Sequence, residues 1–348
     1  MVCGWVGQRR PRRGTLGQES TGEDGLLTSQ APNTRSVRHL LEDAIRAGDG
    51  VVGGGGVLTH VPQPLSRPFG SAELVEHEAV QAIDVGESRA PLPSASFLDG
   101  IQRYAVVGRF GLVPVVRGSV AAAVLGRHKQ DLSVECLQSE EFIVVCINRL
   151  SDRQLCKLEA TGLPICDSGE AEREHPILDV HMAARIVEGR REAVELAAAR
   201  EYLRDRSQDW LVVDGSVAPY LDESEASRVL GLIKSHETQF LEGNDLKTAL
   251  TLPVGFRTSV FARPIGKRSM VHSWYLRLWP LEGHDLLFGL VRLERAPVED
   301  GALRATEISG WMLSERSPLS APDGRWDRLI YPVRRVESYL RAQMGDWL

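Results

Sequence analysis

Two short segments of the sequence each place an aspartate directly before a glycine. They are Phe97-Leu98-Asp99-Gly100 and Trp210-Leu211-Val212-Val213-Asp214-Gly215-Ser216. Each begins as an apolar run with strand character, and glycine permits a tight turn where such a run stops. Both aspartates are therefore expected at strand ends, on one edge of a sheet. Two carboxylates held there by neighbouring strands can bind divalent metal ions over a phosphodiester, although Asp-Gly pairs also make ordinary turns.

A third carboxylate is available on the helix that precedes the second motif. Apolar residues recur at helical spacing over 177–205 and predict a helix there. Glu188, Glu192 and Glu195 occupy one face of it, at positions i, i+4 and i+7. We select Glu195 as the third carboxylate because it lies in the most apolar stretch of the helix. The alternative is a solvated acidic stripe paired with neighbouring arginines, since carboxylates are rarely buried.

Further along the chain, basic and aromatic residues occur on predicted strands. The run from Leu230 to Ile233 delivers Lys234 to its end, where an ammonium group can offset charge on a phosphate or on the carboxylates. A lysine at a sheet edge is also a common protection against strand pairing. On the strand predicted over 272–278, Tyr275 and Arg277 can contact a nucleic acid strand by stacking and phosphate pairing, although alternate residues of a strand also belong to the core.

The elements that must position these residues follow an α/β order. Residues from Ser96 to Leu125 predict an antiparallel meander whose first strand ends at Asp99. After it we expect the following elements: a strand over 142–147, the helix over 177–205, strands ending at 214 and 234, strands over 272–278 and 286–294, and a final helix from 331 to 344. The expected fold class is thus α/β, with a mixed sheet flanked by helices.

The segment before residue 95 has a different character. Residues 1–35 are polar, with little apolar periodicity, and are predicted to be a disordered tail. Residues 36–94 are predicted to hold a short helix over 36–47, a glycine-rich linker and a possible helix over 72–82. The sequence therefore divides into a tail, a linker region over 36–94 and a main domain over 95–348.

Composition narrows the function classes. The chain has 348 residues, of which 43% are hydrophobic, so it can bury a substantial core. No window approaches the roughly 18 consecutive apolar residues of a membrane span, and no secretory signal core follows the basic residues near the N-terminus, so we expect a cytoplasmic protein without membrane contact. The net charge of −6 argues against a uniformly basic nucleic-acid-binding surface but allows a local basic groove. Four cysteines at ten-residue intervals, Cys136 to Cys166, match no zinc pattern and are expected to be buried or partly buried free thiols.

Taken in order, these motifs resemble the NurA nucleases, whose core is an RNase H-like fold related to that of Argonaute PIWI domains. Besides the two Asp-Gly motifs and the helix around Glu195, the resemblance rests on Gly231-Leu232-Ile233-Lys234-Ser235, Trp274-Tyr275-Leu276-Arg277-Leu278, Val291-Arg292-Leu293-Glu294 and Tyr331-Pro332. It covers roughly residues 95–345. The resemblance implies an RNase H-like nuclease domain with Asp99, Glu195 and Asp214 as ligands of Mn²⁺ or Mg²⁺, Lys234 as a catalytic residue and Tyr331 near the substrate. It also implies DNA as substrate, a homodimer, and a HerA-type hexameric translocase as partner in end processing or repair.

The sequence departs from the family pattern at three places. Ile101 follows the first Asp-Gly, where the family has Ser. Family members tend to carry a His eight residues after the Tyr of Tyr-Pro, and here that position is Tyr339, with Glu337 close by as a possible oxygen ligand. The long spacing between the Asp-Gly motifs predicts an insertion at about 127–176. A catalytically weak or inactive subunit of the same fold, serving as a docking or DNA-binding module, is therefore the alternative function.

Overall fold

The computed structural model describes most of the chain. The described residues are 34–52, 69–86, 94–128, 131–170, 174–205, 209–221, 226–266, 269–297, 301–316, 328 and 330–343. The predicted disordered tail lies outside the described residues except for its last two positions, which begin the first helix.

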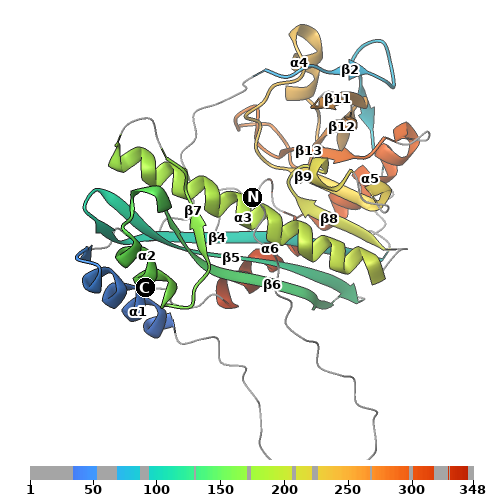
Figure 1. The fold of residues 1–348 in the computed structure, drawn as a ribbon. Coiled ribbons are helices and arrows are strands. Elements are labelled where there is room, and N and C mark those ends of the chain that lie inside the picture. The colour runs from blue at the N-terminus through green and yellow to red at the C-terminus, as the bar shows by residue number, and fades with distance from the viewer. Residues whose placement is uncertain are drawn as a thin grey trace, which may run out of the picture.

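One mixed sheet organises the described residues (Figure 1). Its strands are β1 (Val51–Val52), β2 (Glu73–Leu74), β3 (Ala82–Asp84), β4 (Ala95–Phe110), β5 (Val113–His128), β6 (Asp131–Val145), β7 (Ile165–Asp167), β8 (Trp210–Asp214), β9 (Val229–Ile233), β10 (Phe256–Thr258), β11 (Phe261–Ile265), β12 (Ser269–Arg277) and β13 (Leu290–Arg295). The main path runs β2-β11-β12-β13-β9-β8-β4-β5-β6-β7, while β1, β3 and β10 pair at its margins.

The centre of the sheet combines two kinds of pairing. Strands β4, β5 and β6 form the expected antiparallel meander, and β4 pairs in parallel with β8, which pairs in parallel with β9. An antiparallel meander continued on one side by parallel strands is the arrangement expected of an RNase H-like sheet. The predicted fold class, a mixed α/β sheet flanked by helices, is confirmed.

Helices cover both faces of this sheet (Figure 1). They are α1 (Thr34–Ala47), α2 (Asp152–Glu159), α3 (Pro176–Asp205), α4 (Gly243–Leu250), α5 (Gly301–Glu315) and α6 (Tyr331–Gln343), with short 3-10 turns at Ile147–Arg149, Ala218–Tyr220 and Ala226–Arg228. The long helix α3 lies against β4, β5 and β6, and α6 packs against β4, β5 and β8.

The described residues form four buried apolar clusters, and two of them lie on opposite faces of β4 and β8. Phe97 of β4 and Val212 of β8 pack with Val336 of α6 in what we call the α6-side cluster. Leu98 of β4 and Val194 of α3 belong to the α3-side cluster, together with Val213. Because successive side chains of a strand point to opposite faces, any polar residue of β4 or β8 can be assigned to one side. Among the described residues, no helix is both long and apolar enough to cross a membrane.

Several predicted elements are confirmed and two are wrong. Helices over 36–47, 177–205 and 331–344 correspond to α1, α3 and α6. The helix suggested over 72–82 is wrong, because that segment forms β2 and β3, which pair with β11 and β10. The first strand of the meander does not end at Asp99, since β4 continues without a break to Phe110. The four cysteines are free thiols, as expected, but only three of them are buried or partly buried, because Cys156 is exposed.

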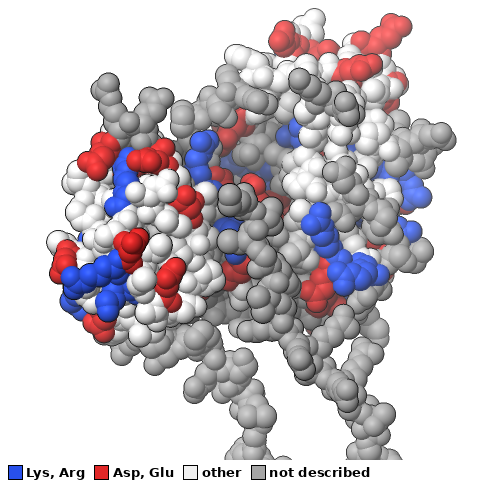
Figure 2. All heavy atoms as spheres, viewed as in Figure 1, with Lys and Arg blue, Asp and Glu red and all other residues white. Residues whose placement is uncertain are grey.

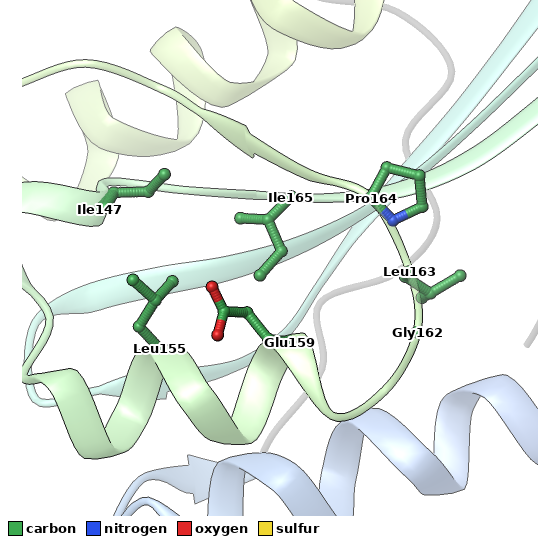
Figure 3. Close-up of a pocket in the computed structure, with 7 residues that line it drawn as sticks. All are labelled: Ile147, Leu155, Glu159, Gly162, Leu163, Pro164 and Ile165. Atoms are coloured by element: carbon green, nitrogen blue, oxygen red, sulfur yellow. The ribbon is translucent and has the colours of Figure 1, made fainter. Parts of the chain in front are cut away.

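The segment 127–176 contains β6, α2 and β7, and its status as an insertion stays a prediction. It also forms an open hollow of about 470 Å³ at the β7 edge of the sheet (Figure 3). The hollow is lined by Ile147, Leu155, Glu159, Gly162, Leu163, Pro164 and Ile165. It contains only one charged side chain, so it is chemically unlike the carboxylate site described next.

Candidate active site

Asp99 lies inside β4, beside the point where β8 ends. Its neighbour Leu98 pairs with Val213, so Asp99 and Asp214 occupy adjacent positions on parallel strands. Each aspartate stands two residues after a member of the α6-side cluster and therefore points to the same face as that residue. Asp99 is only 9% exposed, and its Oδ1 accepts a hydrogen bond of 2.8 Å from the backbone N–H of Gly100. The two Asp-Gly motifs thus meet at one place on the sheet, as their sequence pattern predicts.

Gly100 has a different role from the one that its sequence suggests. The sequence predicts a turn after Asp99, but Gly100 pairs with Ala122 inside the β4–β5 ladder. A Cβ atom at Gly100 would lie 2.2 Å from Oε1 of Glu195 and 2.6 Å from its Cγ. The glycine is therefore required for close approach of the Glu195 carboxyl group to the sheet, rather than for a change of chain direction.

Asp214 fits the original expectation. It is the last residue of β8, and Gly215 follows with a φ of 136°, a conformation that favours glycine. Lys234 follows directly after β9, the neighbouring parallel strand. Its Nζ donates a hydrogen bond of 2.6 Å to Oδ2 of Asp214, and both side chains are mostly buried. The predicted approach of Lys234 to the carboxylates is therefore present.

Burial and several neighbouring acidic groups affect the pKa of Asp99. Burial raises the pKa of this carboxyl well above its usual range, and the charge of Asp214 raises it further. Lys234 opposes that shift, whereas Glu195 and Glu337 add to it. Glu337 belongs to α6 and pairs with Arg341 on the same helix. It thus contributes a fourth carboxylate near Asp99, from the helix on the opposite face to α3.

Glu195 is held at this site by an ion pair within α3. Arg191, one turn earlier, donates from Nη1 to Oε1 of Glu195. Burial nevertheless raises the pKa of Glu195 to about 7, against the lowering effect of Arg191, and Asp214 raises it further. Glu192 on the same helix is 62% exposed, as a solvated acidic stripe would predict. No sequence motif identifies Arg191 as part of the site. Its i,i+4 spacing to Glu195 on a predicted helix does, however, predict an ion pair between the two residues.

The donor atoms at this site suit a hard divalent cation. Carboxylate oxygens are preferred ligands of Mn²⁺ and Mg²⁺. Burial, together with the neighbouring acidic charges, raises the pKa values of Asp99 and Glu195. Within the described residues, however, no three His, Cys, Asp or Glu side chains are arranged as a ready metal site. In the described structure two of the carboxylates are instead engaged in ion pairs, Glu195 with Arg191 and Asp214 with Lys234.

The structure does not bring Arg277 and Tyr275 to the carboxylates. Arg277 is completely buried and donates to the backbone carbonyls of Leu250, Leu252, Leu286 and Phe288. Tyr275 is 6% exposed and stacks on Phe261. Both side chains are therefore part of the core, and the prediction that they contact substrate is corrected here. Tyr331 is 47% exposed at the first residue of α6, and its predicted contact with substrate stays a prediction.

Charged residues gather near the middle of the molecule. Figure 2 shows a hollow in the face where α3 lies, with Lys or Arg and Asp or Glu side chains on its walls. In the ribbon view the same region separates the long strands β4, β5 and β6 from the group formed by β9, β11, β12 and β13 (Figure 1). Asp214 ends β8 between these two groups of strands.

Comparisons with known proteins found structural likeness without sequence likeness. No family model matches the sequence, and no curated protein matches it. Among solved structures, the NurA nuclease from Sulfolobus solfataricus has a TM-score of 0.41 at 12% identity, over 78% of this chain and 82% of that chain. A human ENDOV structure has a TM-score of 0.31 at 16% identity, over 78% and 92% of the two chains. The catalytic domain of human Endonuclease V has a TM-score of 0.29 at 12% identity, over 91% and 99%. A NurA nuclease is thus among the solved structures to which this chain is similar.

Proposed function

We propose that this protein is a metal-dependent nuclease that cleaves DNA at the cluster formed by Asp99, Glu195 and Asp214. The observation that carries the proposal is that Asp99 of β4 and Asp214 at the end of β8 lie side by side on one face of the sheet, while Glu195 of α3 approaches the β4 backbone at Gly100. Burial and the charges of the other two raise the pKa of Asp99. A group of acids that repel one another in this way is stabilised by a divalent cation.

Each residue has a distinct task in this proposal. Asp99, Glu195 and Asp214 would hold Mn²⁺ or Mg²⁺, and the chemistry that the bound ions supply is activation of water and stabilisation of the leaving oxygen. Glu195 has a pKa of about 7, so its carboxyl group can accept or release a proton near neutral pH. Lys234 lies beside Asp214 and can offset negative charge on the phosphate that reacts.

The biological setting is proposed on the resemblance in the sequence. We expect the protein to act as a homodimer with a HerA-like hexameric ATPase, in processing or repair of DNA ends. The resemblance rests on the order of motifs over residues 95–345, and it assigns the same three carboxylates to the metal site.

A non-catalytic role is the second candidate, and two observations favour it. Arg191 and Lys234 each neutralise one of the carboxylates in the described structure. Tyr339 occupies the position at which the family carries a histidine, and it packs against the α6-side cluster. In this candidate function the protein keeps the fold in order to dock onto a translocase or bind DNA.

A cleavage assay separates the two functions. The purified protein is incubated with end-labelled single-stranded and duplex DNA in Mn²⁺, Mg²⁺ or EDTA. We expect cleavage only with a metal ion, and its loss in an Asp99→Asn/Asp214→Asn variant, by a factor on the order of 10³.

The matched control is Asp245→Asn, which removes an aspartate from α4, where its carboxylate accepts from the N–H of Val80. This variant should cleave like the wild type. Absence of cleavage with every metal, even after addition of a cognate ATPase, would favour the non-catalytic role.

A further inference from the structure

A second cluster of buried charges lies next to the carboxylate site, on the neighbouring strands. It is centred on Glu294 of β13, whose side chain is completely buried. Arg263 of β11 and Arg292 of β13 both donate to the Glu294 carboxylate. Two arginines thus surround a single glutamate, and the cluster carries a net positive charge.

The two guanidinium groups are held in fixed positions. Ser216 Oγ donates to Glu294 over 2.7 Å and accepts from Nη2 of Arg263 over 2.8 Å. Both guanidinium carbons also lie over the ring of Phe240, at 5.5 Å for Arg263 and 4.7 Å for Arg292. Ion pairs, a hydroxyl group and an aromatic face therefore restrict both arginines to one arrangement.

Some donors of this cluster remain available. Within the described residues, Nη1 of Arg263 and both Nε and Nη2 of Arg292 form no hydrogen bond. The side chain of Arg263 is 13% exposed and that of Arg292 is 8% exposed, so a small part of each reaches the solvent. Fixed guanidinium groups with free N–H donors match the geometry of phosphate oxygens better than a flexible ammonium group does.

The position of the cluster connects it with the carboxylates. Ser216 follows Asp214 by two residues, and two residues of extended chain span at most roughly 7 Å. Arg292 and Glu294 alternate with Val291 and Leu293 of the α6-side cluster, so their side chains point to the opposite face of the sheet. Asp99 and Asp214 point to the α6 side, so the two groups lie on opposite faces of the sheet and come together at the end of β8, where Ser216 follows Asp214. A nucleic acid strand that passes this end can reach both groups.

We propose that Arg263 and Arg292, oriented by Glu294 and Ser216, form a binding site for a backbone phosphate of a single nucleic acid strand. This site deepens the proposed nuclease function and rests on it for the identity of the strand as substrate. The arginines bind a phosphate next to the one that reacts and so position the strand at the end of β8, where Asp214 lies.

The test measures binding apart from cleavage. Fluorescence anisotropy of a labelled single-stranded DNA is recorded in EDTA, over a series of salt concentrations, with wild type, Arg263→Gln and Arg292→Gln. Each substitution should weaken binding about tenfold. The plot of log K against log salt should become shallower by about 0.7 for each phosphate of the single strand that the variant no longer neutralises.

Two further variants keep the test decisive. Arg263→Lys retains the charge beside Glu294 but removes the planar fork, so it should keep the melting temperature near that of wild type and still bind more weakly. Arg46→Gln removes an exposed arginine of α1 and matches the change in net charge, so it should bind like wild type.

The outcomes separate this inference from the proposed function. Equal affinity and salt slope for wild type and the folded arginine variants would overturn the phosphate site, even if the protein cleaves DNA. Arginine-dependent binding without cleavage in any metal ion would support the phosphate site and overturn the nuclease function. Labelled RNA in parallel assays shows whether the strand must be DNA.

Discussion

Two buried charge clusters lie next to each other in this protein and have opposite balances. Around Asp99, four carboxylates are accompanied by Lys234 and Arg191, and the pKa of Asp99 is raised. Around Glu294, two arginines accompany one carboxylate. Burial alone would raise the pKa of Glu294, but the hydrogen bond from Arg263 and the charges of both arginines lower it below its usual value.

The difference indicates what each cluster is suited to bind. An acidic cluster whose carboxyl groups repel one another is relieved by a cation, whereas a cluster with excess guanidinium charge is relieved by an anion. A nuclease needs both, because its substrate is a polyanion and its catalytic ions are cations. The two clusters are joined through Asp214-Gly215-Ser216, since Asp214 belongs to the first and Ser216 to the second.

The largest change in stability is expected from breaking the basic cluster. Glu294→Gln removes the carboxylate that, among the described residues, compensates both Arg263 and Arg292. We therefore expect it to lower the free energy of unfolding by about 3–5 kcal/mol. Urea denaturation measures the change. Glu307→Gln on α5, where the side chain is 49% exposed, is the control and should alter the free energy by less than about 0.5 kcal/mol. Equal effects of the two substitutions would contradict a compensating role for Glu294.

In the acidic cluster, removal of a carboxylate should stabilise the protein rather than destabilise it, and this effect should grow as pH rises. The pKa of Glu195 is about 7 in the folded protein, against an ordinary value of 4.5. The folded state therefore favours the protonated carboxyl, and the stability that this provides is present below pH 4.5 and is lost as pH rises through 7. The free energy of unfolding of Glu195→Gln, relative to that of wild type, should therefore increase by up to about 3 kcal/mol between pH 4.5 and pH 8.

Urea denaturation of both proteins at the two pH values tests this gain. Glu192→Gln, on the exposed face of the same helix, should show no such gain. A difference between Glu195→Gln and wild type that stays constant with pH would contradict a raised pKa for Glu195.

A smaller effect is expected where the acidic cluster meets the sheet. Gly100→Ala introduces a methyl group that displaces the Glu195 carboxyl, which should cost about 1–2 kcal/mol of unfolding free energy and weaken Mn²⁺ binding. Gly189→Ala on α3 meets no atom within 4 Å and should instead stabilise the protein by up to about 1 kcal/mol. Chemical denaturation and metal titration of both variants test the difference. Wild-type metal affinity in Gly100→Ala would show that the position of Glu195 does not matter.

Sequence patterns predicted much of the acidic cluster because its residues lie in strongly patterned elements. Asp214 is the last residue of a short apolar strand, and Glu195 lies in the most apolar stretch of a long helix, so both positions could be predicted from the local sequence. The end of β4 could not be predicted in this way. The strand continues through Gly100 because it pairs with β5, not because of a local sequence preference.

The basic cluster was not predicted from the sequence for a related reason. Arg263 and Glu294 lie on strands far apart in the chain, and the antiparallel pairing of β11, β12 and β13 brings them together. No local spacing records that register. Arg277 was selected as a substrate contact for its residue type, but the backbone carbonyls around it hold it in the core.

The central claim is that the acidic cluster is a metal site, and titration calorimetry with Mn²⁺ at pH 6.5 tests it most directly. Measured in two buffers of different ionisation enthalpy, binding to the wild type should release protons, because carboxyl groups with raised pKa values must lose them to bind a cation. The Asp99→Asn/Asp214→Asn variant should not bind. Absence of Mn²⁺ binding by the folded wild type, or equal binding by the double variant, would contradict the account.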